Sequence, residues 1–448
     1  MFMKLLCISL GCDKNLVDSE KMLGMLYEDG FSFTDDEAEA DVILVNTCCF
    51  IGDAKEESVN TLLEMAEYRK SGPCRALIVT GCMAQRYKEE ITREIPEVDA
   101  VVGTTAFDEI VKVIRGVLSG QEHIQQFEEL SALPGTEGRR LVTTGGCYAF
   151  LKIAEGCDKR CTYCIIPYLR GPYRSVPMEK LVREAEELAE KGIKELILVA
   201  QETTLYGVDL YGRKCLPELL KNLCRIPGIQ WIRIQYCYPE EITDELIQTI
   251  REEEKICHYL DIPIQHASDR ILKRMNRRTN QAELREMIGK LRREIPDIAL
   301  RTTLISGFPG ETQEDHEELC RFVDEMEFER LGVFAYSLEE DTPAASFPDQ
   351  VPQEVKEGRR DEIMELQQEI AFEACEAMVG RELEVLIEGK VADENAYVGR
   401  TYMDAPGVDG MIFVNTGLEL MTGDFVRVRV TGALEYDLIG EVCDESAQ

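Results

Sequence analysis

The first 120 residues repeat one pattern of apolar and polar positions three times. A short apolar run, often β-branched, leads into a turn and then into a helical stretch. Apolar runs of this length without alternation are typical of strands covered on both faces of a parallel sheet. The three runs lie at residues 4–10, 41–46 and 75–80. Residues 1–120 are therefore predicted to form a doubly wound α/β domain with a parallel sheet.

Residues 121–146 lose this pattern and are polar and rich in glycine, which predicts a linker. From residue 147 the chain returns to alternating strands and amphipathic helices, including helices at 178–191 and 281–294. Six strands are predicted, at residues 151–154, 195–200, 231–236, 259–263, 300–305 and 332–337. Six βα units favour a parallel sheet curved into a partial (β/α)6 barrel, because a complete eight-unit barrel needs a longer chain.

The pattern changes again after the sixth strand. Residues 353–378 predict one long helix that ends near Gly380 and completes a domain at 147–378. Five short alternating runs follow within residues 380–446, at 383–387, 396–400, 411–414, 425–430 and 434–440. Short strands at this spacing predict a small antiparallel β-barrel, an architecture that often binds oligonucleotides.

Acidic residues outnumber basic ones by 85 to 50, which gives a formal net charge of −35. Phosphate neutralisation supplies most of the affinity of RNA-binding proteins, so RNA binding is not expected to dominate. Residues 381–445 alone hold fourteen acidic and five basic side chains. An acidic surface favours a basic partner such as a ribosomal protein. The alternative is that the charge only maintains solubility.

The chain has seventeen cysteines, an odd number without the regular spacing of a disulfide framework. This usage predicts a reducing compartment and a cytoplasmic protein. The apolar N-terminus is interrupted at Gly11, Cys12 and Asp13, too early for a membrane span, so no membrane association is expected.

Each of the three N-terminal strands is followed by a cysteine: Cys12, Cys48 and Cys82. The carboxyl ends of parallel strands lie along one edge of a sheet, so these thiols are predicted to converge. A redox sensor or a zinc site would also use three thiols, although zinc normally takes a fourth ligand. Cys49 directly follows Cys48. We predict Cys48 as the ligand because it is equivalent in position to Cys12 and Cys82.

Three more cysteines, Cys157, Cys161 and Cys164, follow the strand at 151–154 with the spacing C-x₃-C-x₂-C. Three thiolates can hold three irons of a 4Fe-4S cluster and leave the fourth iron without a protein ligand. A site for electron transfer alone would normally take four cysteines. The open iron therefore indicates chemistry at the cluster, and the end of a barrel strand is where barrel enzymes place their active sites.

The C-x₃-C-x₂-C segment closely resembles that of the radical S-adenosylmethionine enzymes, and the whole chain resembles the methylthiotransferase family. The motifs that carry the resemblance are Leu10-Gly11-Cys12 with Asn15 and Asp18-Ser19-Glu20, Asn46-Thr47-Cys48, Gly81-Cys82-Met83-Ala84-Gln85 and Glu155-Gly156-Cys157. The resemblance implies an N-terminal three-cysteine domain, a radical S-adenosylmethionine domain and a TRAM domain. It also implies two 4Fe-4S clusters, one held by Cys12, Cys48 and Cys82, and one held by Cys157, Cys161 and Cys164.

S-adenosylmethionine would bind at the second of these clusters. Residues 305–309 resemble the strand-to-loop element that lines the adenosine, which implies S-adenosylmethionine contacts at Gly307 and Pro309. No catalytic residue beyond the cluster ligands is predicted, and His266 is assigned no role.

Within the family, residues 9–20 resemble the branch that modifies an aspartate of small-subunit ribosomal protein twelve. This implies that a radical derived from S-adenosylmethionine takes hydrogen from the aspartate β-carbon. The cluster held by Cys12, Cys48 and Cys82 then delivers a sulfur that another S-adenosylmethionine has methylated. An electron donor is also required. The alternatives are a tRNA adenosine 2-methylthiotransferase, which shares every cluster cysteine, and a non-catalytic iron-sulfur sensor or binding protein. The acidic C-terminal domain favours the protein substrate.

Overall fold

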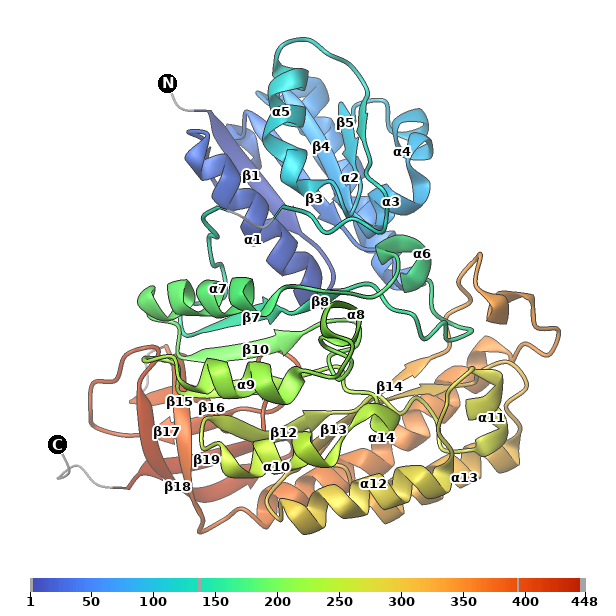
Figure 1. Cartoon of the computed structure of the whole chain (residues 1–448), viewed down its shortest axis with the longest axis vertical. Coiled ribbons are helices and arrows are strands. Elements are labelled where there is room, and N and C mark those ends of the chain that lie inside the picture. Colours follow the sequence, from blue (N-terminus) through green and yellow to red (C-terminus); the bar gives the residue numbers. More distant parts are fainter. Residues whose placement is uncertain (1–2, 136–137, 393–394, 444–448) are drawn as a thin grey trace. The chain divides into compact units, whose positions relative to one another are not determined.

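The structure is a computed structural model that describes residues 3–135, 138–392 and 395–443 (Figure 1). It divides into two compact units. The first unit contains Met1–Thr143, Ala154–Val176 and Ser337–Ala345. The second contains Thr144–Ile153, Pro177–Tyr336 and Ser346–Gln448. Among the described residues, no helix combines the length and apolar character that a bilayer crossing would require.

The first unit is built on a six-stranded parallel sheet in the order β2-β1-β3-β4-β5-β6. Its strands are β1 (Lys4–Ser9), β2 (Ser32–Phe33), β3 (Val42–Thr47), β4 (Ala76–Gly81), β5 (Ala100–Val102) and β6 (Ile124–Gln126). Its helices are α1 (Asp13–Glu28), α2 (Gly52–Ser71), α3 (Cys82–Tyr87), α4 (Glu89–Glu94) and α5 (Ile110–Leu118). The doubly wound parallel sheet predicted for this region is confirmed.

Both faces of this sheet are buried, which explains why its central strands are continuously apolar. Neighbouring residues of a strand point to opposite faces. Accordingly, Ile43 packs in one core cluster with Leu62 of α2, and Leu44 packs in another with Leu26 of α1. The segment 121–146, for which the sequence predicts a linker, contributes β6 to the sheet edge. Three residues are too few to show a period, so the pattern did not reveal this strand.

The second unit contains another six-stranded parallel sheet, in the order β14-β13-β12-β11-β10-β7. Its strands are β7 (Tyr148–Lys152), β10 (Glu195–Val199), β11 (Trp231–Ile234), β12 (Ile256–Asp261), β13 (Ala299–Ser306) and β14 (Arg330–Ala335). Eight helices accompany them within the described residues: α7 (Met178–Glu190), α8 (Val208–Tyr211), α9 (Leu216–Cys224), α10 (Asp244–Glu252), α11 (Asp269–Arg274), α12 (Gln281–Glu294), α13 (Gln313–Met326) and α14 (Gln353–Glu376). The described sheet does not close, which confirms the partial (β/α)6 barrel.

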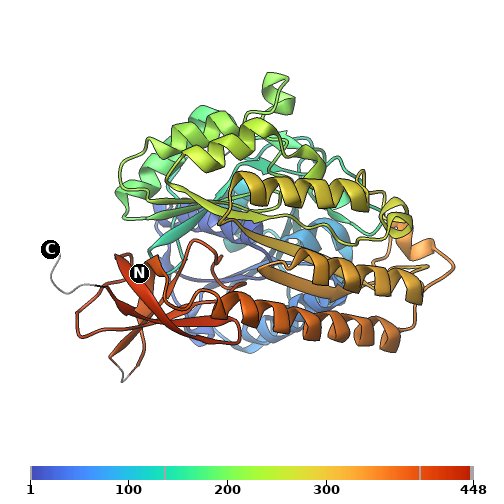
Figure 2. The same cartoon turned by 90° about the horizontal axis from the view of Figure 1, so that it is seen from below.

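Helices cover the outer face of this curved sheet, as Figure 2 shows in green, yellow and orange. Their buried residues follow the helical period, as Leu181, Ala185 and Leu188 do in α7. The long helix α14 ends close to the predicted position, and the backbone turns at Gly380 with φ +87°. This left-handed conformation suits glycine, because glycine has no Cβ to clash.

The chain then forms a closed barrel in the order β15-β16-β17-β19-β18. Its strands are β15 (Glu382–Lys390), β16 (Ala396–Arg400), β17 (Ile412–Asn415), β18 (Phe425–Leu434) and β19 (Asp437–Val442). The small barrel was predicted correctly. The prediction that it is antiparallel holds for every neighbouring pair except β17 and β19, which are parallel. A closed ring with an odd number of strands cannot alternate in direction throughout, so one parallel pair is unavoidable.

A layer of buried ion pairs joins this small barrel to the amino ends of the strands of the second sheet. Glu195, the first residue of β10, accepts hydrogen bonds from Arg233 at 2.7 Å and from Arg400 at 2.6 Å. All three side chains are at most 2% exposed. Burial alone would raise the pKa of Glu195, but the two guanidiniums outweigh burial and lower it. We refer to these three residues as the Glu195 layer.

Candidate functional site

Cys12, Cys48 and Cys82 follow three adjacent strands of the first sheet. Cys12 immediately precedes α1, Cys48 comes directly after β3, and Cys82 is the first residue of α3. The strands pair in register, with Ser9 beside Asn46 and Asn46 beside Thr80, so their carboxyl ends lie level.

The three thiols are close enough to influence one another electrostatically. Burial is the main reason that the pKa of Cys48 is raised to about 12, and neighbouring Cys82 and Cys12 add to the rise. Burial also raises the pKa of Cys82, against an opposing effect of the Arg170 guanidinium. The three cysteines thus lie at one edge of the sheet and interact electrostatically, and their role as ligands stays a prediction. Thiols must lose their protons to bind a metal, so a metal bound here would displace those protons.

The backbone at two glycines approaches the neighbouring strand ends so closely that a side chain would clash there. Gly11 has φ +86°, and a Cβ placed there would lie 2.6 Å from Cys48 Cβ and 2.8 Å from Cys48 Sγ. A Cβ at Gly81 would lie 2.3 Å from Asn46 Oδ1. Glycine at these two positions lets the strand-end loops pack closely, and three thiols at one sheet edge are a donor set that fits an iron-sulfur cluster with three protein ligands.

Cys49 has different surroundings from Cys48. Its side chain is completely buried in an apolar core cluster that includes Leu62 and Ala84. The main chain of Cys48 is held by Ser58, whose hydroxyl accepts from Cys48 N at 3.1 Å and donates to Cys48 O at 2.8 Å. These surroundings support Cys48 as the ligand and Cys49 as a core residue.

The remaining motif residues hold the strand-end loops together. Asn15 donates from Nδ2 to the carbonyls of Leu10 and Thr47, both at 3.0 Å. Asn46 donates from Nδ2 to Asn15 O at 2.8 Å and to Ser19 Oγ at 2.9 Å. These amide and hydroxyl side chains therefore fix the loops that carry Cys12 and Cys48.

The second cysteine set lies in a loop of the same unit, after β8 (Ala154–Glu155) and before α6 (Ile166–Arg170) and β9 (Arg174–Ser175). Cys157 and Cys161 are buried and Cys164 is half-buried. Cys157 N donates to Gly171 O at 3.1 Å, and Cys164 N donates to Cys161 O at 3.0 Å. A Cβ at Gly156 would lie 2.1 Å from Pro172 O. The loop therefore folds back on itself, and its three thiols come from one short segment.

Arg170, at the end of α6, was not singled out by the sequence analysis. Its side chain is 2% exposed and forms ion pairs with Asp18 at 2.7 Å and Glu155 at 3.1 Å. Its other terminal nitrogen donates to Asn15 Oδ1. Arg170 thus connects α1, which follows Cys12, with the strand that leads into Cys157. In the sequence, Arg170 is only an arginine that follows the short apolar run 165–169. Such a pattern is too weak to predict that the arginine is buried.

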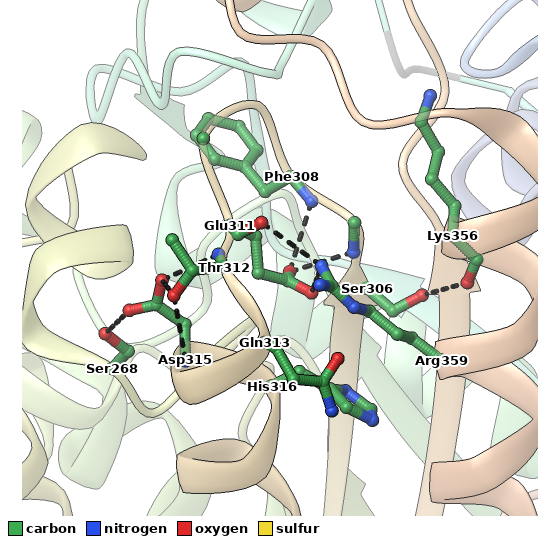
Figure 3. Close-up of polar contacts among 12 residues, drawn as sticks. Ser268, Ser306, Phe308, Glu311, Thr312, Gln313, Asp315, His316, Lys356 and Arg359 are labelled. Carbon is green, nitrogen blue, oxygen red and sulfur yellow. Dashed lines mark hydrogen bonds and ion pairs between the residues drawn. The ribbon is translucent and has the colours of Figure 1, made fainter.

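Gly307 and Pro309 lie in the second unit, at the carboxyl end of β13, where barrel enzymes place their active sites. Gly307 has φ +69°, and a Cβ there would lie 2.3 Å from Lys356 Cγ. Gly307 N and Phe308 N donate to Glu311 Oε2 at 2.8 and 3.2 Å (Figure 3). Pro309 O accepts from Arg274 Nε at 3.1 Å. The loop is thus held in shape by its own carboxylate.

The sequence analysis did not predict a role for Glu311. In the structure its carboxylate lies between Arg359 and His266. Arg359 of α14 donates to Glu311 Oε1 at 2.8 Å, as Figure 3 shows. His266 Nε2 lies 3.4 Å from Glu311 Oε2. Glu311 is 5% exposed, so this carboxylate is buried together with the groups that balance it.

One further group of ligand-type side chains became visible only in the structure. His316 Nε2 lies 2.8 Å from Glu362 Oε2 and 3.6 Å from Cys320 Sγ. Of the residues described, these three have ligand atoms within 4.8 Å of one another. Glu362 is 65% exposed, and its contact with His316 is also that of an ordinary ion pair.

Comparison with family models divides the chain into three matched segments. Residues 4–103 match an uncharacterised family, UPF0004. Residues 151–323 match the radical SAM superfamily, and residues 379–443 match the TRAM domain.

The chain is 67% identical over 438 residues to the ribosomal protein uS12 methylthiotransferase RimO of Lachnoclostridium phytofermentans, which covers 98% of this chain and 99% of that protein. The chain belongs to the RimO family of methylthiotransferases. Identity to RimO of Acetivibrio thermocellus is 53%, over 98% of each chain. RimO of Clostridioides difficile is 49% identical, over 99% of this chain and all of the relative. The resemblance stated from the motifs is thereby confirmed at the level of the family.

Solved structures show the same fold at low identity. The radical S-adenosylmethionine methyltransferase TsrM of Kitasatospora setae superposes with a TM-score of 0.56 at 14% identity, over 77% of each chain. The cobalamin-dependent S-adenosylmethionine radical enzyme OxsB has a TM-score of 0.53 at 13% identity, over 82% of this chain and 56% of OxsB. Membership of the radical SAM superfamily implies a 4Fe-4S cluster and S-adenosylmethionine as cofactors of this chain.

Proposed function

We propose that this chain transfers a methylthio group to the β-carbon of an aspartate in ribosomal protein uS12, the small-subunit ribosomal protein twelve. The observation that carries the proposal is the presence of two cysteine triads in one compact unit, linked through Arg170. The relatives named for this activity match nearly the whole chain at up to 67% identity, which supports it further.

In this proposal Cys157, Cys161 and Cys164 hold the 4Fe-4S cluster that binds S-adenosylmethionine, and the loop of Gly307 and Pro309 contacts the adenosine. Cys12, Cys48 and Cys82 hold a second 4Fe-4S cluster. When bound, the two clusters and S-adenosylmethionine supply a radical for an unactivated C–H bond and a methylated sulfur to replace the hydrogen. The proposal keeps the predicted domains at 1–120, 147–378 and 380–446 and the predicted linker at 121–146.

The protein itself supplies ligands and fixed geometry. Asn15, Asn46 and Ser58 hold the loops that present the N-terminal thiols. Glu311 and Arg359 hold the Gly307 loop in one conformation before any ligand arrives. Preorganisation of this kind removes the entropic cost of ordering the site at the moment of binding.

The TRAM domain favours a protein substrate over tRNA. One of its few basic residues, Arg400, is 2% exposed and engaged by Glu195 and Glu388. Arg427 and Arg429 both pair with Glu382, at 3.5 and 2.7 Å. An RNA-binding face needs basic side chains that can reach phosphates, but Arg400 is buried, Arg427 and Arg429 lie beside Glu382, and residues 381–445 hold fourteen acidic and five basic side chains. An acidic protein of this kind suits a basic partner in the cytoplasm.

The test begins with iron content after anaerobic reconstitution, which should be about eight irons per chain, four for each cluster. The variant with Cys157, Cys161 and Cys164 all replaced by Ala should keep half the iron and lose cleavage of S-adenosylmethionine. The variant with Cys12, Cys48 and Cys82 replaced should still cleave S-adenosylmethionine but transfer no sulfur. Four irons in the intact chain would contradict the two-cluster proposal.

Substrate choice is tested by mass spectrometry of uS12 and of bulk tRNA from cells that lack the chain. We expect uS12 to lose the methylthio group while tRNA keeps its own. The loss of methylthio groups from tRNA alone would instead establish the tRNA alternative, and no change in either would favour a non-catalytic role.

A further inference from the structure

Arg170 carries a permanent positive charge in the interior of the first unit. The guanidinium is 2% exposed, and arginine is not deprotonated in proteins. Three side chains from two different segments hold it: Asn15 and Asp18 of α1, and Glu155 of β8. The carbonyl of the residue before it, Leu169, accepts from Thr104 Oγ1 at 2.7 Å and so anchors the helix end. The charge therefore occupies one defined place.

The same guanidinium lies beside the N-terminal thiols. Asn15 Oδ1 accepts from the Arg170 guanidinium and also from Cys82 Sγ, the latter at 4.0 Å, so the guanidinium and the thiol share one partner. The guanidinium also opposes the rise that burial causes in the pKa of Cys82. In a low-dielectric interior such a charge acts more strongly than it would in water. All three N-terminal thiols thus interact electrostatically with one buried cation.

We propose that Arg170 is a positioning residue that sets the reduction potential of the cluster held by Cys12, Cys48 and Cys82. This inference rests on the proposed function, which supplies that cluster. An added electron makes a cluster more negative, so a nearby fixed cation favours the reduced state. Charge and hydrogen bonds to cluster sulfurs are the means by which proteins adjust such potentials.

Asp18 and Glu155 determine how much of this charge acts on the cluster. Both carboxylates partly neutralise the guanidinium, at 2.7 and 3.1 Å. Removing the charge of Asp18 should therefore act in the opposite direction from removing Arg170. A purely structural role for Arg170 predicts no such reversal of sign, because either change would only loosen the same contacts.

The experiment uses the full chain with Cys157, Cys161 and Cys164 replaced by Ala, so that only the N-terminal cluster is present. Arg170→Met, Arg170→Lys and Asp18→Asn are introduced into it, and each protein is reconstituted and titrated potentiometrically with detection by electron paramagnetic resonance. We expect a more negative potential for Arg170→Met and a less negative one for Asp18→Asn. Arg170→Lys keeps the charge and should stay near the parent.

Arg400→Met is the matched control, because it also removes a buried guanidinium but one that pairs with Glu195 and Glu388. It should lower stability and leave the potential unchanged. If Arg170→Met retains four irons and the potential of the parent, the inference is wrong. If Arg170→Met does not hold iron, the potential of Asp18→Asn becomes the test. A potential of Asp18→Asn that equals that of the parent, or is more negative, overturns the inference. A parent protein without a cluster would instead contradict the proposed function.

Discussion

Two regions of this molecule bury arginine against carboxylate, and they do so with different consequences. Arg170 lies among the N-terminal thiols and pairs with Asp18 and Glu155. Arg400 of the Glu195 layer pairs with Glu195 and Glu388 and joins the TRAM barrel to the strands of the second sheet. Both guanidiniums are buried, but Arg170 adjoins the N-terminal thiols and Arg400 adjoins packed apolar residues. A buried charge therefore does not identify a functional site by itself. What distinguishes Arg170 from Arg400 is that Arg170 lies beside the N-terminal cysteines.

The largest effect is expected when the proposed sulfur ligand Cys48 is compared with its neighbour in the chain, Cys49. Cys48→Ala should abolish methylthio transfer and reduce iron to about half, because the N-terminal cluster loses one of three ligands. Cys49→Ala should retain both, with stability lowered by about 1 kcal/mol for a small cavity in the core. Iron analysis and mass spectrometry of uS12 would measure the outcomes. Equal losses in the two variants would mean that Cys48 was assigned wrongly.

A second prediction concerns the Glu195 layer. Glu195→Gln removes the carboxylate partner of Arg233 and leaves Arg400 with only the partly exposed Glu388, so the free energy of unfolding should fall by about 3–5 kcal/mol. Denaturant unfolding of the reconstituted protein would measure this loss.

Iron content per folded chain should not change in Glu195→Gln, since Glu195 contacts none of the proposed ligands. A Glu195→Gln protein that still folds but has lost iron would show that the Glu195 layer influences iron binding.

The third prediction separates the strain of alanine at positive φ from the steric effect of a methyl group beside Cys48. Gly11→Ala places a methyl group against Cys48 Sγ, so iron binding at the N-terminal triad should fall. Gly30→Ala is the control, because Gly30 has a similar φ of +92° with nothing within 4 Å of a Cβ. Both variants should lose about 1 kcal/mol of stability because alanine is strained at positive φ, and Gly11→Ala should lose more because its methyl group clashes with Cys48. Iron analysis should distinguish them, and equal iron contents would contradict the proposed cluster site.

The smallest effect is expected at a carboxylate outside both regions. Asp315 caps α13 together with Thr312 and pairs with Arg270. Its burial would raise the pKa of its carboxyl, but hydrogen bonds from Arg270, Ser268 and Thr312 lower it well below its ordinary value. Asp315→Asn should therefore lower the free energy of unfolding by about 1 kcal/mol at neutral pH.

The pH dependence of this effect has a definite sign. A carboxyl whose pKa is lowered on folding stabilises the protein above its unfolded pKa of about 4, and loses that contribution as the pH falls. The difference in unfolding free energy between the original protein and Asp315→Asn should therefore shrink below that pH. A difference that stays constant in acid would mean that the charge of Asp315 contributes nothing.

Elements with enough residues to show a period were predictable. The six strands of the second sheet and helices α7, α12 and α14 lie within a few residues of their predicted ranges. Strands β2, β5 and β6 were not predicted, because two or three residues cannot display a period. The C-x₃-C-x₂-C loop was predictable because all its ligands belong to one short segment.

The sequence by itself determined the family, the two cysteine sets and the order of the domains, because these follow from spacing and local pattern. Tertiary structure alone decided which charges surround the cysteines. Arg170 meets Asp18 and Asn15 across more than 150 positions of the chain, and Arg400 meets Glu195 across about 200. Such pairs leave no periodic trace, because only the packing of distant segments brings them together and excludes the water that would otherwise screen them.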